Sequence, residues 1–401
     1  MLKKMLCGIL CAVMLIVAIP APTIYASDLE ENIKDELNNE AELGNATVGG
    51  VSVNAESAVL MDATTGTVLF AKSANTPLPP ASVTKIMTLL LVAEALESGA
   101  ITLDKKVRVS ESAASMGGSQ IFLKEGEEFT VEELLKSTVI ASANDAAVAL
   151  AELIAGSEAG FVGMMNRRAK ELNMKNTVFE NATGLDDTVE NHLTGAYDIA
   201  LMSRELMKHD AVMKYSGVWQ DSIRNGEFIL TNTNRLVRYY SGCTGLKTGS
   251  TDKAGFCISA TAERDGMELI AVIMGAPTRD ERNTAARTLL DYGFANYAVF
   301  SDPETTLERV PVKRGCCADV EVYSTSFSAL IGREDLRRVE KTYSIPDNII
   351  APFDKGAKIG EVIYRIGDRE LGRADICTAD GCRALNLIDV FLLMLSAHFV
   401  K

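Results

Sequence analysis

The stretch that decides the fold runs from Pro79 to Gly99 and reads PPASVTKIMTLLLVAEALESG. The prolines stop the preceding segment, Ser82 can begin a helix over Val83–Ser98, and Gly99 can end it. Apolar residues cover nearly the whole circumference of this helix, which predicts that it is buried inside a domain. Two polar side chains, Ser82 and Lys85, stand at its beginning and are candidates for chemistry.

Short β-prone runs lie on both sides of this helix in the sequence. They are Ser57–Met61, Thr67–Ala71, Gly255–Ala262 and Glu268–Ala276, joined in pairs by turn residues at Asp62–Gly66 and Arg264–Gly266. Helical patterns dominate two regions between the pairs, Val131–Leu172 and Tyr197–Lys208. Strands at both ends with helices between them predict an α/β layered fold, a five-stranded or similar antiparallel sheet packed by helices, with a helical subdomain. We assign this domain to residues 51–300.

The pattern changes after Pro303. Four short β-type segments follow, at Leu307–Val312, Val320–Tyr323, Lys358–Ile366 and Leu371–Ile376, and they predict a small all-β C-terminal domain over residues 301–383. Residues 384–401 are apolar and long enough for a helix. Such a helix can lie in a membrane surface or dock on the protein, and the pattern leaves both alternatives open.

The N-terminus has the pattern of an export signal. Lys3 and Lys4 precede the apolar run Met5–Ile19, and Pro20–Ala26 offers a breaker and a small residue for cleavage. The apolar run is shorter than the roughly 20 residues of a spanning helix, so an uncleaved anchor is the weaker alternative. We predict a cleaved signal over residues 1–26, an acidic linker over residues 27–50, and an exported protein.

Composition excludes several classes of function. The formal net charge of −14 argues against nucleic-acid binding, which needs Lys and Arg concentrated on one face. The chain has three histidines and neither a G-x-S-x-G nor an H-E-x-x-H motif, so the sequence lacks the signatures of Ser-His-Asp hydrolases and of zinc peptidases. We expect no metal and no cofactor.

Cysteine usage fits an exported protein. Cys7 and Cys11 lie in the export signal, and six cysteines remain after it: Cys243, Cys257, Cys316, Cys317, Cys377 and Cys382. Their spacing fits no zinc site. Cys377 and Cys382 flank a turn-like Thr-Ala-Asp-Gly, so one alternative is a cross-link between them, and the other is that the thiols are free or buried.

A lysine base is the remaining route to an activated nucleophile. Ser82 and Lys85 are three residues apart, which brings their side chains to the same face of a helix. In apolar surroundings the ammonium form of Lys85 is disfavoured, so the amine can take the serine proton near neutral pH. Ser250 and Lys253 repeat the spacing, but they fall in a turn before a strand and we attribute that match to chance.

Two further motifs follow in order. Ser142-Ala-Asn144 comes after an amphipathic helical pattern, and Lys247-Thr-Gly249 leads into an apolar strand. Each motif alone is common in turns and strand ends. Together with Ser82 and Lys85 they form the three-part signature of the penicillin-recognising serine enzymes.

The segment Pro80–Thr88 resembles the active-site box of the D-Ala-D-Ala carboxypeptidases, the low-molecular-mass penicillin-binding proteins. Further agreement lies in Met116–Leu123, Asn181–Asp186, Ala196–Ala200 and Gly245–Gly249, and the resemblance spans Ala55 to Lys401. It implies the penicillin-binding/β-lactamase-like transpeptidase fold, a catalytic domain at residues 51–300, and a C-terminal membrane anchor at residues 384–401. This anchor lacks a basic face, because only Arg383 and Lys401 flank it.

The resemblance also implies roles for individual residues. Ser82 is the expected nucleophile, Lys85 its base, and Ser142 a proton relay between Lys85, Lys247 and the leaving amine. Asn144 is expected to hold the substrate's amide carbonyl. The expected ligands of the terminal carboxylate are Lys247, Thr248 and Arg282, with Gly249 in the same motif, and the N–H groups of Ser82 and Ser250 form the oxyanion hole.

The implied substrates are peptidoglycan stem peptides ending in D-Ala-D-Ala, and β-lactams are the implied covalent inhibitors. Three rival functions remain open on the sequence. A β-lactamase needs a deacylating base, for which Glu180 is the candidate. A non-catalytic β-lactam or peptidoglycan receptor would keep the fold alone, and a transpeptidase or endopeptidase would use the same residues. The expected location is the outer face of the cytoplasmic membrane or the cell wall.

Overall fold

The structure is a computed structural model that describes residues 51–187 and 189–399. The export signal predicted at residues 1–26 and the acidic linker predicted at residues 27–50 lie outside the described residues, so both stay predictions.

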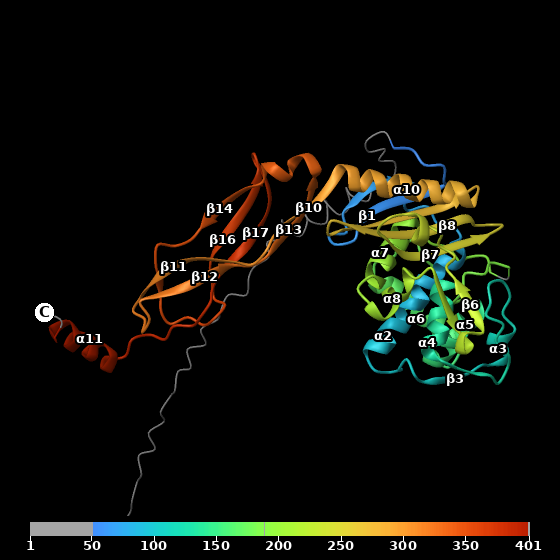
Figure 1. The fold of residues 1–401 in the computed structure, drawn as a ribbon, viewed down its shortest axis with the longest axis horizontal. Helices are drawn as coiled ribbons and strands as arrows, with labels where there is room; N and C mark the ends of the chain where they lie inside the picture. The colour runs from blue at the N-terminus through green and yellow to red at the C-terminus, as the bar shows by residue number, and fades with distance from the viewer. Residues whose placement is uncertain (1–50, 188, 400–401) are drawn as a thin grey trace, which may run out of the picture. The chain divides into compact units, whose positions relative to one another are not determined.

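A five-stranded antiparallel sheet forms the centre of the first domain, as predicted. Its strands, in spatial order, are β2 (Val68–Lys72), β1 (Ser57–Asp62), β9 (Met267–Ala276), β8 (Gly255–Arg264) and β7 (Cys243–Thr251). The long helix α10 (Arg279–Asn296) lies along one face of this sheet and α7 (Ala196–Leu206) lies against the other (Figure 1). The pairing of β1 with β9 joins the two ends of the domain in one core.

Helix α2 (Lys85–Glu97) is buried, as its apolar composition predicts, but it begins later than expected. Ser82 lies in a 3-10 turn, η1 (Ala81–Thr84), directly before α2. Ala81 has a left-handed φ of 47°, so helical backbone does not extend back through Ala81, and the turn that follows it precedes α2. The serine therefore sits on a tight turn that feeds into the helix.

The helical subdomain divides the predicted helical region Val131–Leu172 into three helices. They are α4 (Val131–Ile140), α5 (Asn144–Ala155) and α6 (Glu158–Glu171). Thr130 begins α4 with a capping box to Glu133, and Gly156 ends α5 at a φ of 75°. The break between α4 and α5 falls at Ser142, which puts that hydroxyl at a helix junction.

Shorter elements complete the first domain. They are α3 (Glu111–Ala114), α8 (Asp210–Ser216), α9 (Leu236–Tyr239), η2 (Arg224–Gly226), and the paired strands β3 (Lys106–Arg108) with β4 (Glu128–Thr130) and β5 (Gln220–Ile223) with β6 (Phe228–Thr231).

The chain after residue 297 is β-rich, as predicted. One sheet has the order β14 (Glu340–Ser344), β16 (Lys358–Ile366), β17 (Arg369–Thr378), β12 (Asp319–Ser324), β11 (Thr305–Lys313) and β15 (Ile349–Ile350). A separate pair consists of β10 (Tyr297–Asp302) and β13 (Phe327–Gly332), and the turn η3 (Arg333–Arg338) follows. Tyr364 is buried, stacks on Phe327 with ring centroids 4.0 Å apart, and donates a hydrogen bond to Asp302.

The disulfide differs from the cross-link considered from the sequence. Cys382 bonds Cys317, whose Cα lies 6.2 Å away, and not Cys377. Cys377 is a free thiol buried in β17. The segment after β17 instead runs beside the β11–β12 connection, which brings Cys382 to Cys317.

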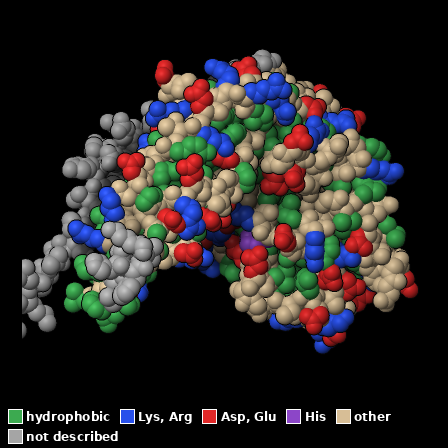
Figure 2. Space-filling view, turned by 60° about the vertical axis from the view of Figure 1, so that its left-hand side comes forward, with side chains coloured by type: hydrophobic (Ala, Val, Ile, Leu, Met, Phe, Trp, Pro, Cys, Tyr) green, Lys and Arg blue, Asp and Glu red, His purple; other side chains and the backbone are tan. Residues whose placement is uncertain are grey.

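The C-terminal segment forms helix α11 (Leu387–Phe399). Within the described residues no single helix is long and apolar enough to cross a membrane, and only α5 and α6, bent by 82°, pass such a test as a pair. On the face in Figure 2, acidic and basic side chains are interspersed. The expectation that the chain does not bind nucleic acid stays a prediction.

Candidate active site

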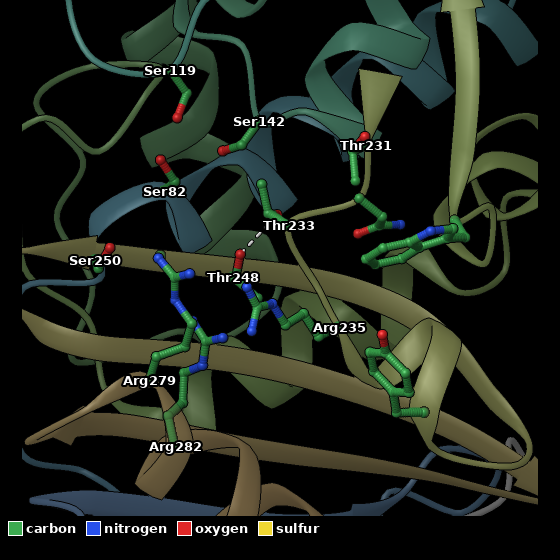
Figure 3. A pocket seen from close by; sticks show the side chains of 14 residues that line it. Ser82, Ser119, Ser142, Thr231, Thr233, Arg235, Thr248, Ser250, Arg279 and Arg282 are labelled. Carbon is green, nitrogen blue, oxygen red and sulfur yellow. Dashed lines mark hydrogen bonds between the residues drawn. The ribbon is translucent and has the colours of Figure 1, made fainter. Parts of the chain in front are cut away.

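Three segments that are far apart in the sequence meet at a cavity of about 580 Å³. They are the η1 turn, the α4–α5 junction and strand β7 (Figure 3). The side chains that line the cavity are Ser82, Ser119, Ser142, Trp219, Thr231, Asn232, Thr233, Arg235, Tyr239, Thr248, Gly249, Ser250, Arg279 and Arg282. Of the residues expected from the sequence, Lys85 and Lys247 lie behind this lining, and Asn144 is not part of it.

The first pair of reactive groups is Ser82 and Lys85. The Lys85 Nζ lies 2.9 Å from Ser82 Oγ and 2.8 Å from the carbonyl oxygen of Thr183. Lys85 is fully buried, whereas Ser82 is partly exposed to the cavity. The arrangement places an amine within proton-transfer distance of an accessible hydroxyl.

The second pair repeats this design. Lys247 Nζ donates to Ser142 Oγ at 2.8 Å and to the carbonyl oxygen of Thr248 at 2.9 Å. Ser142 has a left-handed φ of 60°, a conformation that costs energy for a residue with a side chain. This conformation lets one hydroxyl line the cavity and also reach a lysine on β7.

Neither lysine forms an ion pair with a described residue. Burial lowers the pKa of Lys85 well below its ordinary value, and the nearby Lys247 lowers it further, while Asp145 acts in the opposite direction. Burial and the charge of Arg282 lower the pKa of Lys247 to about 7. Both amines are therefore available as proton acceptors near neutral pH.

A loop after Phe179 holds the Lys85 end of the site. Besides the Thr183 carbonyl, the carbonyl of Ala182 accepts a bond from Thr88 Oγ1 at 2.7 Å. Gly184 has a φ of 81°, and a Cβ there would lie 1.8 Å from the Ala81 carbonyl oxygen, so only glycine allows the loop this close to η1.

His192 fastens the same loop to η1. Its Nδ1 accepts the Glu180 N–H at 3.0 Å and its Nε2 lies 2.7 Å from Thr84 Oγ1. Burial lowers the pKa of His192 to about 4, so the imidazole is neutral and its Nε2–H donates to Thr84. No motif in the sequence connects this histidine with the serine.

Asn144 and Asp145 organise the Met116–Leu123 stretch beside Ser142. Asn144 Nδ2 donates to the Gly117 carbonyl at 2.7 Å, while its Oδ1 is buried and has no partner among the described residues. Asp145 accepts the N–H groups of Ile121 and Leu123. The unpartnered Asn144 oxygen is suited to accept an N–H, whereas the sequence suggested that Asn144 holds a carbonyl.

Strand β7 approaches the serine turn very closely at Gly249. A Cβ at this position would lie 2.8 Å from both the Pro80 carbonyl oxygen and the Ser82 nitrogen. Thr248 Oγ1 donates to Thr233 Oγ1 at 2.8 Å, and Ser250 is exposed at the cavity. The absence of a side chain at Gly249 brings the backbone of β7 next to the Ser82 N–H.

Three arginines line the far side of the cavity. Arg282, in the first turn of α10, is 3% exposed and donates to Asn283 and to the Cys257 carbonyl. Burial and the charges of Arg279 and Arg235 lower its pKa to about 10. Arg235 and Arg279 form no ion pair or side-chain hydrogen bond with the described part of the chain. The sequence motifs indicated Arg282 alone, because Arg235 belongs to no motif considered there.

Two residues weighed from the sequence lie elsewhere. Glu180 is exposed, accepts the Asn191 N–H, and does not line the cavity. Lys253 donates to the Asp186 carbonyl, and no hydrogen bond joins it to Ser250 within the described structure.

Comparisons with known proteins agree with this geometry. The family model described as D-alanyl-D-alanine carboxypeptidase matches residues 44–278. D-alanyl-D-alanine carboxypeptidase DacF of Bacillus subtilis is 43% identical over 341 residues, which cover 83% of this chain and 87% of that protein. The crystal structure of penicillin binding protein 5 from Haemophilus influenzae matches with a TM-score of 0.69 at 30% identity, over 83% of this chain and 98% of that one.

A structure with a bound antibiotic is also similar. Penicillin-Binding Protein D2 from Listeria monocytogenes in the ampicillin bound form matches with a TM-score of 0.56 at 30% identity, over 61% of this chain and 99% of that one.

Proposed function

Because the chain belongs to the D-alanyl-D-alanine carboxypeptidase family, we propose that Ser82 is the nucleophile with which it removes the terminal D-alanine of peptidoglycan stem peptides. The observation that carries this assignment is the 2.9 Å contact between Ser82 Oγ and a buried lysine that forms no ion pair with the described residues. The family, the fold class and the enzyme class predicted from the sequence are confirmed by the comparisons.

Acylation begins with proton transfer. Neutral Lys85 takes the proton of Ser82 while Oγ attacks the carbonyl carbon between the two D-alanines. The oxyanion that forms is stabilised by the N–H groups of Ser82 and Ser250, which the close approach at Gly249 supports. This role needs no metal and no imidazole.

The second serine–lysine pair serves the leaving group. As the C–N bond breaks, the D-alanine nitrogen needs a proton, and Ser142 can pass one to it from Lys247 or from the protonated Lys85. Water then hydrolyses the ester on Ser82. The unpartnered Asn144 Oδ1 supports a role as acceptor for a substrate N–H.

The end of the cavity that is lined by arginines is proposed to bind the C-terminal carboxylate of the substrate. Thr248 and Arg282 line the cavity, which supports the carboxylate-binding role that the family resemblance implied, and Arg235 and Arg279 add two further cations to the same lining. Replacing Arg235 or Arg279 by Gln is expected to raise KM for the peptide by about tenfold with a smaller effect on kcat, because each removes one cation from carboxylate binding.

β-Lactams are proposed as covalent inhibitors that acylate Ser82. The similarity to a penicillin-binding protein in an ampicillin bound form supports this proposal. The exposed position of Glu180, outside the cavity, gives no support to a β-lactamase reading.

Location outside the cytoplasmic membrane, on its outer face or in the cell wall, is part of the same proposal. It rests on the export pattern in residues 1–26. The apolar side chains of Leu387, Ile388, Phe391, Leu392 and Met394 are all exposed on α11, which supports insertion of this helix into a membrane surface over docking on the protein.

The test is D-alanine release from diacetyl-Lys-D-Ala-D-Ala, measured beside labelling with a fluorescent penicillin, for the protein and for Ser82→Ala. We expect both activities in the protein and neither in the variant. Labelling without release from any D-Ala-D-Ala peptide would instead indicate a receptor or an enzyme specific for cross-links.

A further inference from the structure

Three cysteine sulfur atoms lie close together near the beginning of helix α11, away from the catalytic residues. Cys316 and Cys317 are adjacent on the connection between β11 and β12, and Cys382 lies on the segment between β17 and α11. Cys317 and Cys382 form the disulfide, and Cys316 is an exposed free thiol. Neither of the alternatives weighed from the sequence included this cluster.

Cys382 is the sulfur that the other two share. Its Sγ is bonded to Cys317 and lies 3.9 Å from the Cys316 Sγ, while the Cys317 N–H donates to it at 3.3 Å. A Cβ at Gly315 would lie 2.7 Å from the same sulfur, so a glycine before the cysteine pair keeps the approach open. A free thiol and a disulfide are thus in contact.

The backbone around the cluster is fixed from both sides. Cys316 N–H donates to the Arg383 carbonyl at 3.0 Å, and Leu385 N–H donates to the Arg314 carbonyl at 2.9 Å. Gly315 and Ala384 form a β-bridge. These bonds hold Cys382 beside both vicinal cysteines, so that its disulfide partner can change while the two segments stay together.

We propose that this cluster is a thiol–disulfide exchange site in which Cys316 and Cys317 alternate as the partner of Cys382. The Cys316 thiolate attacks Cys382 Sγ, the Cys317–Cys382 bond breaks, and Cys317 leaves as a thiolate. One disulfide and one thiol are present before and after the step, so no oxidant or reductant is consumed. The segment before α11 stays covalently attached to the β11–β12 connection in both isomers. The free thiol is Cys316 in one isomer and Cys317 in the other.

Peptide mapping of the full-length protein tests the exchange. The protein is incubated at about pH 8.5, where about half of an ordinary free cysteine is ionised, then quenched in acid and treated with N-ethylmaleimide. Trypsin yields one peptide over residues 315–333 and one over residues 374–383, and fragmentation between the adjacent cysteines locates the link and the label. We expect both the Cys316–Cys382 and the Cys317–Cys382 links, with label on Cys317 and Cys316 respectively. Label on Cys316 alone would overturn the proposal.

Two variants test each disulfide link separately, so the result does not depend on the ratio of the two isomers in the unaltered protein. Cys317→Ser, incubated in air with molecular oxygen as the oxidant, should form the Cys316–Cys382 link, and Cys316→Ser should keep the Cys317–Cys382 link. If Cys317→Ser protein that still labels with fluorescent penicillin leaves both Cys316 and Cys382 alkylated, exchange does not occur. Cys377→Ser, which changes a buried thiol in β17, is the matched control and should leave both links as they are in the unaltered protein.

Discussion

Lysine is used in opposite ways in the two domains. In the catalytic domain, Lys85 and Lys247 are 0% and 1% exposed, and their hydrogen bonds in the described structure go to hydroxyls and carbonyl oxygens. In the β-rich domain, the exposed Lys358 lies 2.7 Å from both Glu361 and Asp375. Burial lowers the pKa of the first two side chains, whereas hydrogen bonds to carboxylates raise the pKa of Lys358.

The difference shows what converts a lysine into a base. A pKa lowered to about 7 means that protonating Lys247 costs roughly 5 kcal/mol more in the folded protein than in water. In the proposed mechanism a lowered pKa is needed, because an amine that is always protonated cannot accept a proton from serine. The lysines in the exposed ion pairs of the β-rich domain stay protonated and are not suited to accept a proton.

The largest expected effect is the loss of the first of these bases. Lys85→Met keeps the volume of the side chain and removes the proton acceptor for Ser82, so the second-order rate of labelling by fluorescent penicillin should fall by about 10³-fold or more. The thermal midpoint should not fall correspondingly, since a desolvated amine is replaced by an apolar group. Labelling at the original rate would show that Lys85 is not the base.

The close packing that excludes water from the lysines can be loosened without touching them. In Gly249→Ala the new Cβ must push β7 away from the Pro80 carbonyl and the Ser82 nitrogen, so acylation should slow by about 10²-fold. Gly163→Ala in α6 is the control, because its Cβ would make only an ordinary contact with Arg167, and it should label normally. Equal rates in the two variants would show that the approach at Gly249 is not needed.

Much of this site could be predicted from the sequence because its reactive groups lie in short motifs. Ser82 and Lys85 are three residues apart. Ser142 lies in the motif Ser142-Ala-Asn144, and Lys247 lies in the motif Lys247-Thr-Gly249. Four strands of the sheet, β1, β2, β8 and β9, also followed from the β-prone runs at Ser57–Ala71 and Gly255–Ala276, whereas β7 was not among those runs.

Other features depend on contacts that no local pattern encodes. The Thr183 carbonyl that holds Lys85 is a backbone group, which any residue could supply. Arg235 lines the cavity from the segment between β6 and α9, where no sequence motif indicated a site residue. The Cys317–Cys382 disulfide joins residues 65 positions apart, whereas the only cross-link considered from the sequence, as one of two alternatives, was the near pair Cys377 and Cys382.

The pH dependence of acylation sharpens the same comparison. Since the pKa of Lys247 is lowered to about 7 and its ammonium form is the one that can supply the leaving-group proton, the rate should be level below that value and fall by about tenfold per pH unit above it. Arg282 contributes to this lowering, so in Arg282→Gln the pKa of Lys247 rises and the inflection should move to higher pH. The rate of penicillin labelling between about pH 5.5 and 9 measures both, and a profile that is flat, or unmoved in the variant, would contradict the assignment.

The smallest effect is expected where lysine is exposed and paired. Lys358→Met makes the same change as Lys85→Met but removes only surface pairs with Glu361 and Asp375, whose value is small because water screens them. Its penicillin labelling and pH profile should equal those of the unaltered protein, and its thermal midpoint should shift by no more than about 2 °C. A loss of labelling here would mean that removing any lysine disturbs acylation, and the contrast between buried and exposed lysines would no longer explain the activity.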